Sequence, residues 1–244
     1  MSPKLILLLC LLFTSPSWAT SLFQWSYSEV QLLTGDGFEL GTSHRSTFTF
    51  DHTNGWRYGG NYLFVDVYQR DDVDVEVYGE WYPHLSLNKL TQRDISFAIF
   101  KDFYLLGGIN AGTEPSEEPF KAYFLGAGTS LDLPWAEYVT IDFTARKPDH
   151  LSTTGLQVTS AWSFPFSVGG LKFKFRGFAD YVTPGGSGGV SYLLTQPQII
   201  LDVGEFLDHP GKFYAGVEFW YWHNKFGIDG VSEEALQAQI IYAF

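Results

Sequence analysis

The sequence predicts an all-β protein, a transmembrane antiparallel β-barrel of about twelve strands after a cleaved signal peptide. Three observations predict this fold. Most of the chain alternates apolar and polar residues with a period of two, a short apolar run opens it, and 45% of its 244 residues are apolar whereas only 17% are charged. The formal charge of −12 argues against nucleic-acid binding, and the 18% aromatic content argues against disorder.

Residues 1–19 have the pattern of a secretory signal peptide. Lys4 precedes an apolar run over residues 5–13, and Ser17 and Ala19 are the small residues before a cleavage site that follows Ala19. The run is too short to span a bilayer. We therefore expect residues 20–244 to form the barrel, without a disulfide, because the single cysteine, Cys10, lies in the signal peptide.

Segments of alternating residues, separated by Gly, Pro, Asn and Asp clusters, predict the strands. In the segment 135–146, for example, Ile141 and Phe143 share one face while Thr140 and Asp142 share the other. The fifth of these segments is too long for one strand and includes a bend or a loop. They lie near residues 23–33, 46–53, 61–69, 75–82, 94–111, 120–129, 135–146, 154–163, 171–181, 191–203, 213–223 and 233–244.

The number of strands follows from the length of the chain. About twelve strands of about ten residues leave connections of ordinary length, whereas eight strands would need connections of about twenty residues each. An even number of strands places both termini on the periplasmic side of an outer membrane.

Aromatic residues near the segment ends favour a membrane barrel over a soluble β-sandwich. Such rings belong at the interfaces of a bilayer, although the alternative is that they fill the core of a sandwich. The residues in question are Trp81, Trp135, Trp162, Tyr181 and Phe213.

The last segment gives a further indication. Ile240, Tyr242 and Phe244 share one face and end in a terminal aromatic residue. This pattern resembles the carboxy-terminal signal of bacterial outer-membrane barrels, which the barrel assembly machinery reads. We expect that machinery to be a partner of the chain.

The polar faces of the segments predict the lining of a narrow lumen. Twelve strands lie between the eight of barrels filled by their own side chains and the 16 to 18 of wide porins. Aromatic rings stack on flat solutes, and carboxylates and amides bind hydroxyls, so a base joined to a sugar fits this lining. The alternative for each residue is that it only fills or solvates the lumen. The candidate residues of the lumen and substrate path are Tyr62, Phe64, Asp66, Tyr68, Glu76, Tyr78, Glu80, Tyr138, Asp142, Lys172, Lys174, Arg176, Glu218, Trp220 and Trp222.

Three cations share one face of the segment 171–181, which is unusual in an acidic chain. We expect Lys172, Lys174 and Arg176 to pair with carboxylates across the pore or with Asp180, because three unpaired cations would repel each other. The alternative is that they bind lipopolysaccharide phosphates, which would require an outward face.

Several stretches of the first half of the chain carry a family pattern. They are Trp25 with Leu33-Thr34-Gly35 and Phe38-Glu39, then Thr47-Phe48-Thr49-Phe50-Asp51-His52, Gly55-Trp56-Arg57-Tyr58-Gly59, Phe64-Val65-Asp66-Val67, Pro83-His84-Leu85-Ser86-Leu87, Lys89-Leu90-Thr91 and Asp94-Ile95-Ser96-Phe97, with the closing Tyr242-Ala243-Phe244. They resemble the Tsx-type nucleoside channels of Gram-negative outer membranes, a family that includes the OmpK-like porins.

This resemblance implies a monomeric twelve-stranded barrel in the outer membrane, in contact with lipid and lipopolysaccharide. It implies facilitated diffusion of nucleosides or similar small molecules through an aromatic-lined passage, with no cofactor. Asp66 is the lumen residue that lies in a matching stretch. The expected outer loops 70–74 and 182–190 are short, so a role as phage or colicin receptor is not carried over.

Other chemistry finds little support in the sequence. The stretch 185–189 matches a hydrolase G-x-S-x-G motif but precedes a predicted strand instead of a helix, and the six histidines show no metal-ligand spacing. Two alternatives to a channel remain. One is a lipase or deacylase with a Ser and a His adjacent on the lipid-facing wall, for which His52 is the candidate; the other is a plugged structural barrel.

Overall fold

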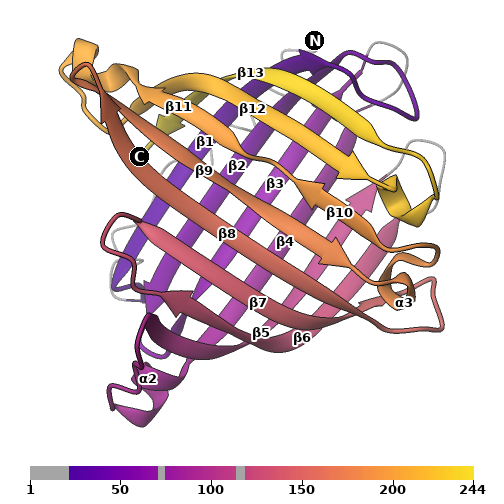
Figure 1. Ribbon diagram of the computed structural model, residues 1–244, viewed down its shortest axis with the longest axis horizontal. Helices are drawn as coiled ribbons and strands as arrows, with labels where there is room; N and C mark the ends of the chain where they lie inside the picture. Colours follow the sequence, from indigo (N-terminus) through magenta and orange to yellow (C-terminus); the bar gives the residue numbers. More distant parts are fainter. Residues whose placement is uncertain (1–21, 71–74, 114–118) are drawn as a thin grey trace.

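The computed structural model describes residues 22–70, 75–113 and 119–244, which form one closed antiparallel sheet (Figure 1). The predicted signal peptide and the acidic residues at 71–74 lie outside the described residues. Cleavage after Ala19 therefore stays a prediction.

Thirteen strand segments make up the described sheet. They are β1 (Trp25–Asp36), β2 (Arg45–Trp56), β3 (Gly59–Gln69), β4 (Glu76–Ser86), β5 (Phe100–Thr113), β6 (Phe120–Leu131), β7 (Tyr138–Pro148), β8 (Gly155–Val168), β9 (Leu171–Val182), β10 (Tyr192–Thr195), β11 (Gln198–Asp202), β12 (Phe213–His223) and β13 (Glu233–Ala243).

Apart from β10 and β11, which do not pair with each other, each strand pairs with its neighbours in sequence, and the last pairs with the first. β10 and β11 both lie between β9 and β12, so they occupy one position in the wall and the barrel has twelve. β13 closes the barrel against β1, in a register that runs from Glu29 opposite Ala243 to Asp36 opposite Leu236. The predicted fold class, an antiparallel barrel of about twelve strands, is confirmed.

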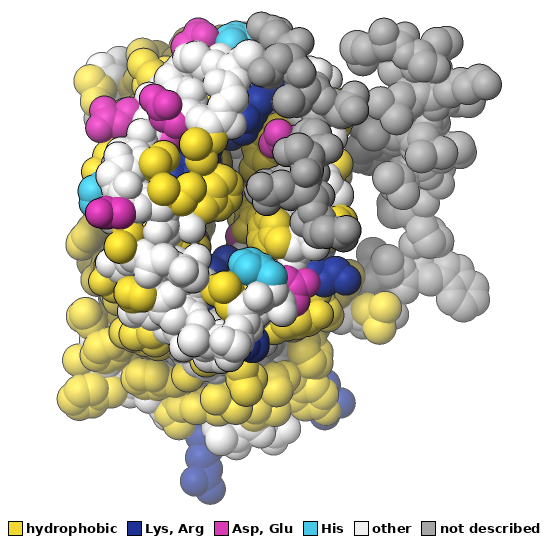
Figure 2. Space-filling view, turned by 90° about the vertical axis from the view of Figure 1, so that its right-hand side faces the viewer, with side chains coloured by type: hydrophobic (Ala, Val, Ile, Leu, Met, Phe, Trp, Pro, Cys, Tyr) yellow, Lys and Arg dark blue, Asp and Glu magenta, His cyan; other side chains and the backbone are white. Residues whose placement is uncertain are grey.

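The two ends of the barrel carry different connections (Figure 1). One end holds α2 (Leu87–Thr91), η3 (Val203–Leu207) and a two-residue turn at Gly169 and Gly170. Both glycines have positive φ, as the tight turn of a β-hairpin requires. The other end holds α3 (Pro184–Ser187) and η4 (Lys225–Gly227). In Figure 2 acidic side chains lie around this second end, a hollow opens among the loops, and hydrophobic side chains cover the outer wall.

None of the helices in the described ranges is long and apolar enough to cross a membrane.

The strand boundaries differ most from the prediction at four places. β4 continues to Ser86 and β8 to Val168, so Trp81 and Trp162 lie in the interior of their strands and not near the ends. β5 begins at Phe100, because residues 87–99 form α2 and the turn after it. The predicted strand 191–203 is interrupted between β10 and β11, where Pro197 has no N–H to donate to the sheet.

The alternation of side chains divides the wall into two faces. In β13, Gln237, Gln239 and Ile241 are buried, whereas the intervening Leu236 and Ile240 are 60% and 63% exposed on the outside. The exposed faces carry large apolar side chains on most strands. The apolar face of most strands is thus outside, as in a barrel whose surroundings are lipid.

Close packing of the wall at Gly126 generates the first prediction. A Cβ at this β6 position would lie 2.0 Å from the carbonyl oxygen of Phe143, in the backbone of the neighbouring strand. We expect Gly126→Ala to lower the free energy of unfolding by about 1–3 kcal/mol, the usual cost of overpacking. Urea titration in detergent micelles measures it.

Gly107 provides the control for this substitution. A Cβ there would meet its nearest atom, the oxygen of Phe124, at an ordinary 3.6 Å. Gly107→Ala should leave the unfolding free energy unchanged or slightly raised. Equal losses in the two variants would show that Gly126 is not sterically constrained.

Candidate functional site

Contacts between strands that are not neighbours identify the inner face of the barrel. Arg176 on β9 reaches Glu29 on β1, and Arg45 on β2 lies against Trp220 on β12. Residues directly opposite each other in an antiparallel pair share a face, so the register identifies the inner-face residues of the other strands. For example, Asp51 lies opposite Glu29 and therefore faces the lumen.

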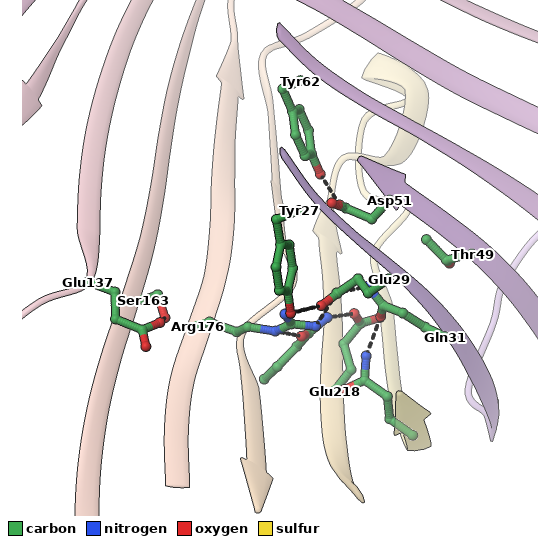
Figure 3. A network of polar contacts seen from close by, with 12 residues as sticks. Tyr27, Glu29, Gln31, Thr49, Asp51, Tyr62, Glu137, Ser163, Arg176 and Glu218 are labelled. Atoms are coloured by element: carbon green, nitrogen blue, oxygen red, sulfur yellow. Dashed lines mark hydrogen bonds and ion pairs between the residues drawn. The ribbon is translucent and has the colours of Figure 1, made fainter. Parts of the chain in front are cut away.

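An ion pair lies inside the lumen at the centre of a polar network (Figure 3). The Arg176 Nη2 and Nη1 atoms donate to the two carboxylate oxygens of Glu29 at 2.7 and 3.0 Å. Arg176 Nε donates to Gln198 Oε1 at 2.7 Å, and Tyr27 Oη donates to Glu29 at 2.8 Å. Glu29 is only 2% exposed. This bidentate geometry gives a buried carboxylate the partners that it needs.

Amide side chains extend this network along β11, β12, β13 and β1. Glu218 accepts hydrogen bonds from Gln198 at 2.7 Å and from Gln237 at 2.8 Å. Gln239 donates to Gln31 at 2.5 Å, and Gln31 donates to Glu29 at 2.7 Å. We call the set Glu29, Gln31, Arg176, Gln198, Glu218, Gln237 and Gln239 the polar belt. It fixes the side chains of this wall in one arrangement.

The other two predicted cations lie nearer the end of the barrel that carries η3. Lys174 pairs with Glu137 at 2.8 Å, and Lys172 pairs with Glu205 at 2.7 Å at the exposed rim. Lys172, Lys174 and Glu137 help to line a cavity of about 280 Å³ at this mouth. All three cations pair with carboxylates, but the expected pairing across the pore is confirmed for Arg176 alone; Glu137 and Glu205 lie in connections at the mouth, and Asp180 is not the partner of any of the three.

Tyrosines hold many of the inner carboxylates, and of the five carboxylates in these pairs only Glu29 also has a cation within 4.0 Å among the residues described. Each of five tyrosines donates its hydroxyl to a carboxylate, and in three of the pairs the oxygens are 2.8 Å apart. The pairs are Tyr27 with Glu29, Tyr62 with Asp51, Tyr68 with Asp66, Tyr78 with Glu80, and Tyr104 with Asp142. A single hydroxyl uses only part of the acceptor capacity of a carboxylate.

Aromatic rings form a continuous row on the inner face of β3, β4 and β6. Phe64 lies 6.0 Å from Tyr62 and 5.9 Å from Tyr78, centroid to centroid, and Tyr78 lies 6.0 Å from Phe120. We call these four residues the aromatic row. Their rings are placed to offer faces and edges to a flat solute.

Arg45 lies at the centre of a second aromatic group, nearer the end with η4. Its guanidinium carbon is 3.6 Å from the ring centroid of Phe38, 4.3 Å from that of Trp220 and 4.5 Å from that of Tyr68. Arg45 reaches Trp220 across β1 and β13, where Gly35 lies opposite it and leaves space. Arg45 is 3% exposed, and its Nε has no hydrogen-bond partner in the described part of the chain.

A buried pair holds the loop 37–44 over this group. Lys225 of η4 donates to Glu233, and the backbone N–H of Glu39 donates to the same carboxylate at 2.6 Å. Burial lowers the pKa of Lys225, and the carboxylate of Glu233 opposes that shift. The loop thus places Phe38 inside the barrel mouth.

All fifteen predicted lumen residues lie on the inner face, and their role in a substrate path stays a prediction. Trp222 lies beside Trp220, with ring centroids 6.2 Å apart, and Glu76 pairs with Arg70.

Ile240, Tyr242 and Phe244 lie on the outer face, and their role as an assembly signal also stays a prediction. The described residues hold no group of three His, Cys, Asp or Glu placed to bind a metal.

Several residues of the inner face were not among the predicted lumen residues. Glu29 and Gln31 alternate with apolar neighbours in β1, so their facing could have been found from the sequence. The position of Arg45 among aromatic rings could not have been found from the sequence, because its partners come from the loop 37–44, β3 and β12.

The outer wall carries a serine beside the histidine that the sequence singled out. Ser28 Oγ lies 2.7 Å from His52 Nδ1 on the neighbouring strand, and Asn54 Nδ2 lies 3.1 Å from His52 Nε2. The Phe50 ring stacks beside His52, with centroids 6.4 Å apart.

Comparisons with known proteins agree with this geometry. The chain is 25% identical over 133 residues to the outer membrane protein OmpK of Vibrio parahaemolyticus serotype O3:K6 (strain RIMD 2210633), a match that spans 49% of this chain and about half the length of the relative, 50%. No family model matches the sequence.

Two solved structures share the fold. They are the KdgM porin, with a TM-score of 0.52, and the KdgM porin in complex with disordered oligogalacturonate, with a TM-score of 0.51. Each match is 10% identical and covers 89% of this chain and 99% of the other.

The ion pair in the polar belt generates the second prediction. Arg176→Gln leaves the buried Glu29 carboxylate without its cation, so we expect a loss of about 3 kcal/mol in unfolding free energy. The double variant Glu29→Gln with Arg176→Gln removes both charges and should recover most of it. Urea titration in micelles measures the unsubstituted barrel and both variants. A single variant no less stable than the double would contradict the prediction.

Proposed function

We propose that this chain, an outer-membrane β-barrel of the OmpK-like porin family, is a channel for passive diffusion of nucleosides or similar small, flat, hydroxylated solutes. The observation that carries the proposal is the aromatic row, which faces the lumen beside carboxylates and amides that accept and donate hydrogen bonds. Rings bind the face of a base, and carboxylates bind the hydroxyls of a sugar.

The interior supports a narrow path in preference to a wide aqueous pore. The polar belt lies on the wall formed by β9, β11, β12, β13 and β1, while the aromatic row lies on β3, β4 and β6. A solute that passes between them contacts rings on one side and amides on the other. We further propose that the barrel acts as a monomer, contacts lipid and lipopolysaccharide, and is inserted by the barrel assembly machinery.

Single-channel recording tests this proposal and generates the third prediction. The refolded barrel in a planar bilayer should show small openings that adenosine blocks and glucose does not. Phe64→Ala removes one stacking face, so we expect the adenosine concentration for half block to rise about tenfold, within the usual range for loss of one base–aromatic contact.

Phe143→Ala is the matched control for Phe64→Ala. Phe143 is a phenylalanine of β7 that is 54% exposed on the outer face. The substitution Phe143→Ala should leave block by adenosine unchanged. Openings that adenosine does not block would refute the nucleoside preference, and the absence of openings would refute the channel.

Ester hydrolysis at the outer wall is a second candidate function, carried by the contact between Ser28 and His52. A serine nucleophile needs a base that accepts its proton, and His52 Nδ1 is within reach. The Asn54 amide must then present its oxygen to the Nε2 proton, in the orientation opposite to the one described above.

Vesicles that contain the refolded barrel and a phospholipid substrate test this second function. If Ser28 is the nucleophile, Ser28→Ala and His52→Ala should each lower the release of fatty acid at least about a hundredfold. Ser160→Ala, on the outer face of β8, is the control. Equal release from all four proteins, or none, would exclude hydrolysis at this pair.

A further inference from the structure

The inner charges of the barrel are not balanced. Five inner or rim cations have a carboxylate within 4.0 Å: Arg70, Lys172, Lys174, Arg176 and Lys225. Two more, Arg45 and Arg146, have no such partner among the described residues; Arg45 contacts aromatic rings, and Arg146 donates to the backbone oxygen of Gly186.

At least six inner carboxylates lack a cation. Within the described ranges, no Lys or Arg nitrogen lies within 4.0 Å of them. Side-chain hydroxyls and amides donate hydrogen bonds to them instead. They are Asp51, Asp66, Glu80, Asp142, Asp180 and Glu218.

These six carboxylates lie on several strands around the lumen. Asp51, Asp66 and Glu80 follow one another on β2, β3 and β4, while Asp142, Asp180 and Glu218 lie on β7, β9 and β12. Negative charge that lines a cleft with low-dielectric walls concentrates cations there and repels anions. These carboxylates outnumber the two inner cations that lack an acidic partner, so the path carries an excess of acidic groups.

We propose that the lumen selects neutral and cationic solutes rich in hydrogen-bond donors and excludes carboxylate-bearing ones. This inference rests on the proposed channel function and specifies its solute class. Each carboxylate keeps acceptor capacity beyond its tyrosine or amide donor, so hydroxyls and amines find acceptors around the path. A uronate finds Arg176, Lys174 and Lys172 already paired with acids.

A solved structure of similar fold contains a solute of the class that we expect this lumen to exclude. The KdgM porin binds oligogalacturonate, which is a polyanion. The two barrels share a fold at 10% identity, so their linings are free to differ.

Two measurements on the refolded full barrel test this inference. In a planar bilayer under a KCl gradient, the reversal potential should show K⁺ about tenfold more permeant than Cl⁻, the lower end of the enrichment that such a cleft gives. In swelling assays on liposomes, galactose and galactosamine should enter faster than galacturonate, which has the same ring and opposite charge to galactosamine.

Substitutions on the inner wall identify the source of the selectivity. The combination Asp51→Asn, Asp66→Asn and Glu80→Gln should bring the permeability ratio close to one, whereas Asp94→Asn, at an exposed position after α2, should not change it. If the triple variant does not fold, each single substitution should lower the ratio in part.

The outcomes separate the two proposals. Openings that favour Cl⁻, or a ratio that the inner substitutions leave unchanged, would overturn the inferred selectivity and leave the channel in place. Entry of galacturonate at the rate of galactose would overturn it as well. No openings and no swelling with any solute would refute the channel itself.

Discussion

A wall one strand thick gives every side chain of this barrel one of two environments, and the period of two decides which. The backbone can face lipid only because each strand pairs on both sides, and the pairing of β13 with β1 satisfies the last edge. Each inward residue is therefore fixed by the parity of its position. A shift of one residue in register would place Leu236 and Ile240 in the lumen and Gln237 in lipid. The polar belt and the aromatic row both depend on this constraint.

The alternation of inward and outward residues explains which strands could be predicted from the sequence and which could not. The segments near 61–69, 120–129, 171–181 and 213–223 match their strands within two residues, because alternation is strong and a turn-forming Asp, Asn or Pro-Gly follows each strand within two residues. Prediction was poorest where alternation stops. Residues 87–99 contain apolar residues without a period of two, and Pro197 interrupts a segment that otherwise reads as one strand.

In the candidate site, the face on which a residue lies was predictable, whereas its contact partners were not. Facing was predictable for Asp66, Tyr78 and Arg176, since each depends only on its own strand. Partners were not predictable, because Glu29 lies 147 residues from Arg176 in the chain. The curvature of the whole wall brings such residues together. The same holds for Arg45, whose aromatic neighbours come from the loop 37–44, β3 and β12.

The join between β1 and β13 also has a consequence for the order in which the molecule is made. Ribosomes release β1 first and β13 last, and contacts as distant as that of Gln31 with Gln239 form only when synthesis is complete. Until then β1 exposes a free hydrogen-bonding edge, which invites aggregation with other chains. Folding rates fall as contacts become more distant in the chain, so we expect closure to be slower than the pairing of strands that follow each other in sequence. A chain truncated before residue 233 would lack the partner of β1 and stay open.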